Sequence, residues 1–299
     1  MRERRYPRRM TSLALFFIVL APATSNACGL ESTLDTLAKS ALPGVLGADL
    51  EVLETRERAT TAGSAHFPMQ SVYKLPIAMA MLREVEAGSR ALGEEVAIEP
   101  SDLVPAGAYS PIRDAHPKGV RMSLEEIVRF AIVESDGTAS DVLLRLLGGP
   151  EKVNTYLSGI GVHDIVVATS EAEMSRDWKV QYRNWATPEG AVLALRTLYE
   201  GAGLSPRNRA LLFEMLAASK PGAARLKGLL PPGTPVAHKT GTSGTLSGVT
   251  AATNDIGIIT LPSGHHLAIA VFLRDSPESD ADRDKAIAEV AKAGFACWH

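Results

Sequence analysis

The sequence predicts an α/β (α+β) protein in which both ends of the chain build one sheet domain and an all-helical domain is inserted between them. Three observations support this fold class. Residues 50–55 alternate as a strand does, every clear element from about Val72 to about Gly222 has helical spacing, and strand patterns return beyond Gly233. Strands at both ends of a helical block are typical of an α/β domain that carries a helical insertion.

Length and composition are those of a globular protein. The 299 residues, 45% hydrophobic and 22% charged, suit one large domain or two smaller ones and exclude a disordered chain, a collagen-like repeat and a coiled coil. The net charge of −3 is unevenly placed, because residues 1–27 hold five Arg and one Glu, which leaves 26 basic against 33 acidic residues and a net charge of −7 for the rest. An acidic chain is a poor candidate for nucleic acid or an anionic membrane surface.

The first 27 residues are predicted to be a signal peptide. A basic stretch, MRERRYPRR, precedes an apolar run at 13–20, and the small residues at 25–27 predict cleavage after Ala27 and a periplasmic or secreted protein. The run is too short to span a bilayer, and no other segment is apolar for long enough. A buried N-terminal helix is the alternative, and Arg8-Arg9 could also belong to a twin-arginine signal.

Individual elements follow from caps and spacing. Residues 30–41 have helical spacing. Ser123-Leu124-Glu125-Glu126 is a capping box that opens a helix, which must end near Ser135-Asp136-Gly137 because residues 138–147 start a new apolar pattern. A cap residue before a proline marks two further helix starts, at Thr187-Pro188 and Ser205-Pro206.

Residues 167–185 have no clear periodicity, and a stretch this long inside a compact domain is usually a functional, omega-type loop. Beyond it we expect strands at 236–240, 253–261 and 267–273, and a final helix at 286–293. The expected domains are therefore a discontinuous sheet domain, 28–64 and 217–299, and a helical domain, 65–216.

The two cysteines, Cys28 and Cys297, lie at opposite ends of the mature chain and lack metal-ligand spacing. They can pair in an oxidising compartment if the termini lie together. Two unpaired thiols are an alternative, and lipidation of Cys28 is a third.

Ser71-Val72-Tyr73-Lys74 is an S-x-x-K tetrad that opens a predicted helix, because Pro76 is tolerated only near a helix start. A Ser at this position faces the positive end of the helix dipole, and Lys74 lies one turn further along the same face. An activated serine needs such an amine to take its proton, and backbone N–H groups to hold an oxyanion.

Two other short segments complete a constellation. Lys239-Thr240-Gly241 lies on a predicted strand, which can align a substrate amide, and glycine allows close approach. Ser135-Asp136 lies on a turn between two helices. Taken in this order, the three segments resemble the S-x-x-K, S-D-N and K-T-G set of the penicillin-recognising serine enzymes.

The resemblance is closer to the class A β-lactamases, and within them to the PER-type extended-spectrum branch. It covers nearly the whole mature chain, and Ser135, Glu171 and Lys239 are spaced by 36 and 68 residues as in that family. Further similar segments are Tyr109-Ser110-Pro111, Glu171-Ala172-Glu173-Met174, Gln181-Tyr182-Arg183-Asn184-Trp185 and Lys239-Thr240-Gly241-Thr242-Ser243-Gly244. The resemblance implies an antiparallel sheet flanked by the N- and C-terminal helices.

The resemblance also implies roles. Ser71 would be acylated, Lys74 would be its proton partner, Glu171 would activate the hydrolytic water with Glu173 as its rival, and Ser135 would pass a proton to the leaving nitrogen. The acylation base, Lys74 or Glu171, stays open. Substrate binding falls to Tyr109, Arg225, Lys239, Thr240, Gly241, Thr242 and Ser243, and the oxyanion hole to the backbone N–H groups of Ser71 and Thr242.

Three departures from the common class A pattern stand out. Gly137 replaces the last residue of S-D-N and removes a side-chain amide contact to substrate. Thr169 and Asn184 replace a salt bridge across the neck of the loop, so we expect Asp141 to accept hydrogen bonds from Asn184 instead. Ser175 stands where Asn commonly helps to hold the water.

These residues together predict a secreted β-lactamase that hydrolyses penicillins and cephalosporins, including extended-spectrum cephalosporins, and confers antibiotic resistance. We expect a monomer with a small-molecule β-lactam substrate, no metal, no organic cofactor and no nucleic acid partner. The alternatives are a penicillin-sensitive D-Ala-D-Ala peptidase and a β-lactam sensor domain.

Overall fold

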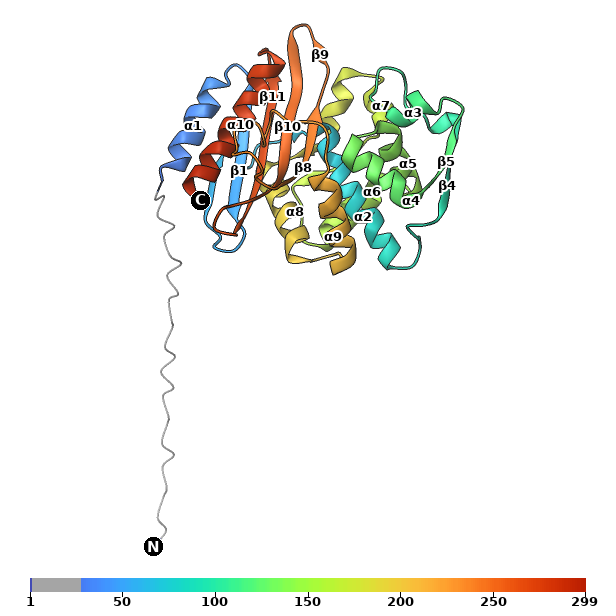
Figure 1. Ribbon diagram of the computed structural model, residues 1–299, viewed down its shortest axis with the longest axis horizontal. Helices are drawn as coiled ribbons and strands as arrows, with labels where there is room; N and C mark the ends of the chain where they lie inside the picture. Colours follow the sequence, from blue (N-terminus) through green and yellow to red (C-terminus); the bar gives the residue numbers. More distant parts are fainter. Residues whose placement is uncertain (2–27) are drawn as a thin grey trace.

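A computed structural model of the chain describes Met1 and residues 28–299, so the predicted signal peptide lies outside the described residues apart from its first one. Figure 1 shows three parts side by side: a pair of helices formed by the two ends of the chain, a central sheet, and a group of helices from the middle of the sequence. The predicted fold class, an antiparallel sheet with flanking terminal helices and an inserted helical part, is confirmed.

The sheet has six strands in the order β2-β1-β11-β10-β8, with β9 paired to β10, and every pairing is antiparallel. Their bounds are β1 Val45–Val52, β2 Arg58–Thr61, β8 Val236–Thr242, β9 Thr245–Leu246, β10 Val249–Thr260 and β11 His266–Ser276. The first strand therefore starts before the predicted 50–55, whereas the three C-terminal strands lie where they were expected. The last strand alternates strictly, because Leu267, Ile269, Val271 and Leu273 enter one hydrophobic core and Ala268, Ala270 and Phe272 the other.

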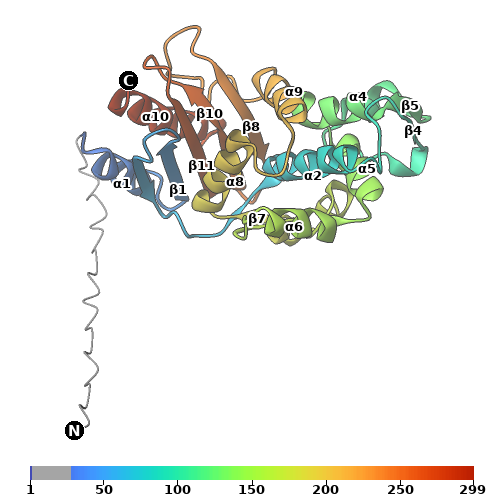
Figure 2. The ribbon, with the colours of Figure 1, turned by 90° about the horizontal axis from the view of Figure 1, so that it is seen from below.

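The outer face of the sheet is covered by α1 (Leu30–Ser40) and α10 (Asp280–Cys297), which lie side by side in both ribbon views (Figures 1 and 2). Leu34 of the first helix and Ile287 of the last are fully buried against this face. Cys28 and Cys297 form a disulfide with their Cα atoms 5.6 Å apart, which decides between the three alternatives left open for them.

Most helices on the other side lie around α2 (Lys74–Glu86), most of whose residues are buried, whereas α8 packs on β1 and β11 (Figure 2). Their bounds are α3 Pro111–Ala115, α4 Leu124–Arg129, α5 Gly137–Leu147, α6 Pro150–Gly159, α7 Glu171–Met174, α8 Pro188–Glu200 and α9 Pro206–Ala217. The capping box of Ser123 and the proline starts at 188 and 206 are confirmed. In the described residues, 28–299, no helix is long and apolar enough to cross a membrane.

The expectation of an all-helical domain between residues 65 and 216 is wrong in two places. Strands β4 (Glu95–Ile98) and β5 (Val120–Ser123) form a two-stranded sheet, and β3 (Phe67–Pro68), β7 (Trp185–Ala186) and β6 (Ile165–Val166) form a three-stranded one. These strands have two to four residues, so they are too short to show a periodicity of two. Where the sheet domain gives way to the helical one, near residues 64 and 217, stays a prediction.

Candidate active site

The proposed nucleophile lies on a tight turn at the start of the central helix. Residues Gln70–Tyr73 form a 3₁₀ turn that runs directly into α2, so the helix begins close to Ser71, as the position of Pro76 predicted. Gln70 has a φ of 47°, a left-handed backbone conformation that residues other than glycine rarely adopt. Strain of this kind next to a reactive group is common at active sites, and here it precedes Ser71 directly.

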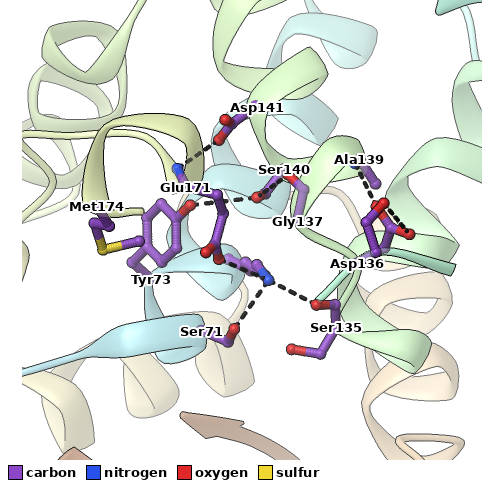
Figure 3. A network of polar contacts seen from close by, with 12 residues as sticks. Ser71, Tyr73, Ser135, Asp136, Gly137, Ala139, Ser140, Asp141, Glu171 and Met174 are labelled. Carbon is purple, nitrogen blue, oxygen red and sulfur yellow. Dashed lines mark hydrogen bonds and ion pairs between the residues drawn. The ribbon is translucent and has the colours of Figure 1, made fainter. Parts of the chain in front are cut away.

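Lys74 connects three of the predicted residues. Its ammonium donates to Ser71 Oγ at 2.9 Å and to the carbonyl of Ser135 at 2.7 Å, and it lies 2.9 Å from Glu171 Oε1 (Figure 3). The side chain of Lys74 is only 2% exposed, so these contacts replace water almost completely. A buried ammonium is tolerated because its three donors are all used, one of them by a carboxylate.

Ser135 lies between two lysines. It follows a π-helical turn, Phe130–Glu134, and has a left-handed φ of 62°. Lys239 reaches it from the sheet and donates to Ser135 Oγ at 2.9 Å and to the Thr240 carbonyl at 3.0 Å. Burial lowers the pKa of Lys239 well below its usual value, and the nearby charge of Lys74 acts in the same direction.

The turn that carries Ser135 is held by its neighbour Asp136. This buried carboxylate accepts hydrogen bonds from the backbone N–H groups of Ile112 and Ala139, at 2.7 and 2.8 Å, and from Ser110 Oγ. The backbone N–H of Gly137 donates to the Tyr109 carbonyl at 3.0 Å, and a Cβ at Gly137 would lie 3.0 Å from the same oxygen. Absence of a side chain therefore lets the Tyr109 segment pack closely on this turn.

Asn184 closes the neck of the predicted loop, but with a different partner from the one expected. Its side-chain oxygen accepts from the backbone N–H groups of Ala168 and Thr169, and its NH₂ donates to the Thr169 carbonyl. The expected hydrogen bond from Asn184 to Asp141 is therefore wrong. Asn184 instead meets the backbone of the opposite side of the neck, because one amide can donate and accept together.

Asp141 contacts the proposed general base directly. Its two oxygens accept from the backbone N–H groups of Glu171, at 2.8 Å, and Ala172, at 2.9 Å (the first is drawn in Figure 3). These are first-turn N–H groups of α7, which have no partner inside the helix. Burial raises the pKa of Asp141 to about 6, although both hydrogen bonds favour its charged form.

Two other side chains of the loop have local roles. Glu173 accepts from the backbone N–H of Ser170 and from Thr169 Oγ1, and so completes a capping box rather than facing Lys74. The hydroxyl of Ser175 donates to the Ala172 carbonyl at 2.8 Å. Of the two rival carboxylates in this loop, Glu171 is the one that contacts Lys74.

Strand β8 forms the opposite wall and lies very close to the nucleophile. A Cβ at Gly241 would be only 2.2 Å from the Met69 carbonyl, so only glycine fits there. Asn254, on the neighbouring strand, donates to the carbonyls of Pro68 and Met69 at 2.8 and 3.0 Å. The sheet thereby holds the segment that leads into Ser71.

Arg225 lies behind this strand and is 8% exposed. It donates to Thr242 Oγ1 at 2.8 Å and to the carbonyls of Gly241 and Asn254, and its Nε pairs with Asp284 at 2.7 Å. The carboxylate of Asp284, on α10, had no signal in the sequence because it belongs to no motif.

A cleft of about 790 Å³ runs between the loop and β8. Eight of the predicted site residues line it: Ser71, Lys74, Tyr109, Ser135, Glu171, Thr240, Thr242 and Ser243. Arg225, Lys239 and Gly241 do not line the cleft, and the side chains of Arg225 and Lys239 are buried behind it. Gln70, Met174, Trp178, Gln181, Glu134 and Lys220 also line it and were not predicted. Among residues 28–299 no group of three or more His, Cys, Asp or Glu side chains could hold a metal ion.

A serine that is hydrogen-bonded to a lysine and lies between a helical part and an antiparallel sheet is typical of the penicillin-recognising serine enzymes. The chain belongs to the Beta-lactamase enzyme family, whose sequence model matches residues 29–298.

Named relatives agree. The chain is 38% identical to beta-lactamase VEB-1 of Pseudomonas aeruginosa over 285 residues, which cover 94% of this chain and 93% of that protein. It is 40% identical to extended-spectrum beta-lactamase PER-1 of the same organism over 231 residues, 77% and 74% of the two chains.

Solved structures agree as well. A beta-lactamase from Chitinophaga pinensis DSM 2588 matches with a TM-score of 0.88 at 36% identity, over 91% of this chain and 100% of that one. The TLA-1 extended-spectrum beta-lactamase matches with a TM-score of 0.87 at 38% identity, over 90% and 98%. The predicted resemblance to class A extended-spectrum enzymes is confirmed, and the protein is a class A β-lactamase that hydrolyses β-lactams.

Proposed function

We propose that the enzyme hydrolyses penicillins and cephalosporins through an acyl-enzyme on Ser71, which is released by a water that Glu171 activates. The observation that carries this proposal is the position of Lys74, whose Nζ lies 2.9 Å from both Ser71 Oγ and Glu171 Oε1. Lys74 can first pass a proton to Glu171 and then, as a neutral amine, take the proton that leaves Ser71 during acylation. Either Lys74 or Glu171 can be the base in this step.

Ser135 supplies the proton that the leaving β-lactam nitrogen needs. Because Lys239 donates to Ser135 Oγ, the hydroxyl proton of Ser135 is free to point into the cleft. The negative charge on the carbonyl oxygen is stabilised by the backbone N–H groups of Ser71 and Thr242. Both residues line the cleft from facing walls.

The substrate carboxylate binds at Thr242. Arg225 donates a hydrogen bond to Thr242 Oγ1, which leaves the hydroxyl proton of Thr242 for the carboxylate and places a guanidinium charge behind it. Lys239, which donates to Ser135 Oγ, places a second positive charge at the end of the cleft where the carboxylate binds. Tyr109, which is 63% exposed, provides an aromatic surface at the mouth of the cleft.

Extended-spectrum cephalosporins belong to the proposed substrates. The cleft of about 790 Å³ leaves room for a bulky acyl group, and the relatives PER-1 and TLA-1 are named extended-spectrum enzymes. We further propose that the protein is a monomer exported by its N-terminal signal peptide to the periplasm or the medium, where the disulfide of Cys28 and Cys297 is stable.

The test is the time course of a chromogenic cephalosporin with the mature protein. Ser71→Ala should abolish turnover, because no acyl-enzyme can form. Glu171→Gln should give a rapid burst of about one equivalent, followed by deacylation at least about a hundredfold slower than in the wild type. Glu173→Gln is the matched control, since Gln also completes a capping box, and it should turn over normally.

Rapid turnover by Ser71→Ala would overturn the assignment of the nucleophile. Normal turnover by Glu171→Gln combined with a burst by Glu173→Gln would move the base two residues along the chain. A wild-type burst that stops after one equivalent would favour the D-Ala-D-Ala peptidase or the β-lactam sensor.

A further inference from the structure

An ion pair lies at the end of the cleft away from the loop that carries Glu171. The ammonium of Lys220 is 2.5 Å from Glu134 Oε1, and both residues line the cleft. Their side chains are 67% and 24% exposed, so water reaches both charges. Neither residue has a part in the acylation and deacylation steps described above.

The backbone holds this pair beside the proposed carboxylate site. Glu134 ends the π-helical turn and directly precedes Ser135, whose hydroxyl accepts from Lys239. Lys220 follows α9, and its backbone N–H donates to the Val133 carbonyl at 3.1 Å. Both charged groups are therefore anchored within two residues of Ser135.

The other cations at this end of the cleft are shielded from water. Lys239 is fully buried, and Arg225 lies behind β8 in an ion pair with Asp284. Lys220 is thus the cation that an approaching anion meets first. An exposed ion pair adds little to stability, but charges at the mouth of a cleft change how fast charged ligands bind.

We propose that Glu134 and Lys220 form a charge filter that selects β-lactams by the charge of the substituent next to the ring carboxylate. The inference rests on the proposed function, which places that carboxylate at Ser135 and Thr242. In a cephalosporin the C3 substituent is bonded to the carbon next to the one that carries the carboxylate, so it lies toward the pair. A cationic C3 group gains Glu134 as a partner, and Lys220 attracts the negative charge of substrates that lack such a cation.

The test compares two cephalosporins with the same acyl side chain, one with a neutral acetoxymethyl and one with a cationic pyridiniomethyl group at C3. The quantity measured is the ratio of kcat/KM for the cationic over the neutral substrate. Lys220→Met leaves the carboxylate of Glu134 unpaired and should raise this ratio about three- to tenfold. Glu134→Gln leaves the ammonium of Lys220 unpaired and should lower the ratio by a similar factor.

Both changes should shrink at 0.5 M salt, because exposed charges are screened. Lys220→Arg keeps the charge and should retain the wild-type ratio, and Lys118→Met, which removes an exposed lysine that does not line the cleft, should leave it unchanged. Equal changes for both substrates in Lys220→Met and Glu134→Gln would show a purely structural role and overturn the charge filter. Failure of the wild type to turn over either substrate would overturn the proposed function instead.

Discussion

Asp141→Asn tests whether the loop that carries the proposed general base, Glu171, depends on a carboxylate beneath it. The substitution keeps the size and shape of the side chain but replaces one oxygen by an NH₂ group. In the wild type, one oxygen accepts from Glu171 N–H and the other from Ala172 N–H. In the variant, the one remaining side-chain oxygen can accept from one of these two backbone N–H groups. The other N–H group then faces the NH₂ group of Asn, which is also a donor.

The size of the effect follows from that lost contact. A hydrogen bond to a charged acceptor contributes about 1.5–3 kcal/mol, and about 1.4 kcal/mol is a tenfold change in a population. The fraction of molecules with Glu171 in position should therefore fall by roughly ten- to a hundredfold. Acylation should change much less, because Ser71 and Lys74 are held by α2 and not by the loop.

The assay is a rapid-mixing time course with a chromogenic cephalosporin from pH 5 to pH 8. The wild type should lose deacylation rate below about pH 6, because the raised pKa of Asp141 means that its carboxyl group becomes protonated there and loses an acceptor. This loss is not acid unfolding. A carboxyl whose pKa is raised on folding favours the folded state in acid, and its contribution is lost as the pH rises through about 6.

Asp141→Asn should show a full burst and slow turnover. Its turnover should decline below pH 6 only as far as the titration of groups other than residue 141 causes. Asp177→Asn is the matched control on the same loop. Asp177 accepts from Lys179 N–H as a helix cap, and asparagine caps equally well, so turnover should be unchanged. Wild-type turnover in Asp141→Asn, or an unchanged decline near pH 6, would refute the reasoning.

Two further predictions concern residues away from the cleft. Asp284→Asn removes the charge that holds Arg225. In steady-state kinetics, KM should therefore rise about tenfold with kcat little changed, and a fall in kcat alone would contradict this prediction. Replacing Cys28 and Cys297 together by Ser removes a link across 269 residues and should lower the free energy of unfolding by up to about 5 kcal/mol. Denaturant titration measures this change, and an unchanged free energy of unfolding would contradict the prediction. The value of kcat/KM should stay within about twofold of the wild type.

Much of the fold could be predicted from side-chain periodicity and caps. The long strands β10 and β11, the capping box of Ser123 and the proline starts of α8 and α9 each carry a local signal. The short strands β3 to β7 could not be predicted, because two to four residues form a strand only when a distant partner is in place. The π-helical turn before Ser135 could not be predicted either, because its residues continue the apolar pattern of α4.

The site divides in a similar way. Ser71, Lys74, Ser135 and Lys239 lie in motifs whose order and spacing are specific, and the structure brings all four together. Residues that contact the site but lie outside these motifs could not be predicted from the sequence. Asp284 approaches from the last helix of the chain, and the hydrogen bonds of Asp141 depend on the path of a loop that no periodicity describes.

The position of β11 has a consequence for the order in which the chain can acquire its structure. Val45–Val52 pair with residues 267–274, which are synthesised much later. Until the ribosome has passed these later residues, β1 and β10 lack the strand that lies between them. The helices from the middle of the sequence can gather earlier, whereas the sheet and the disulfide can be completed only after β11 and Cys297 have been made.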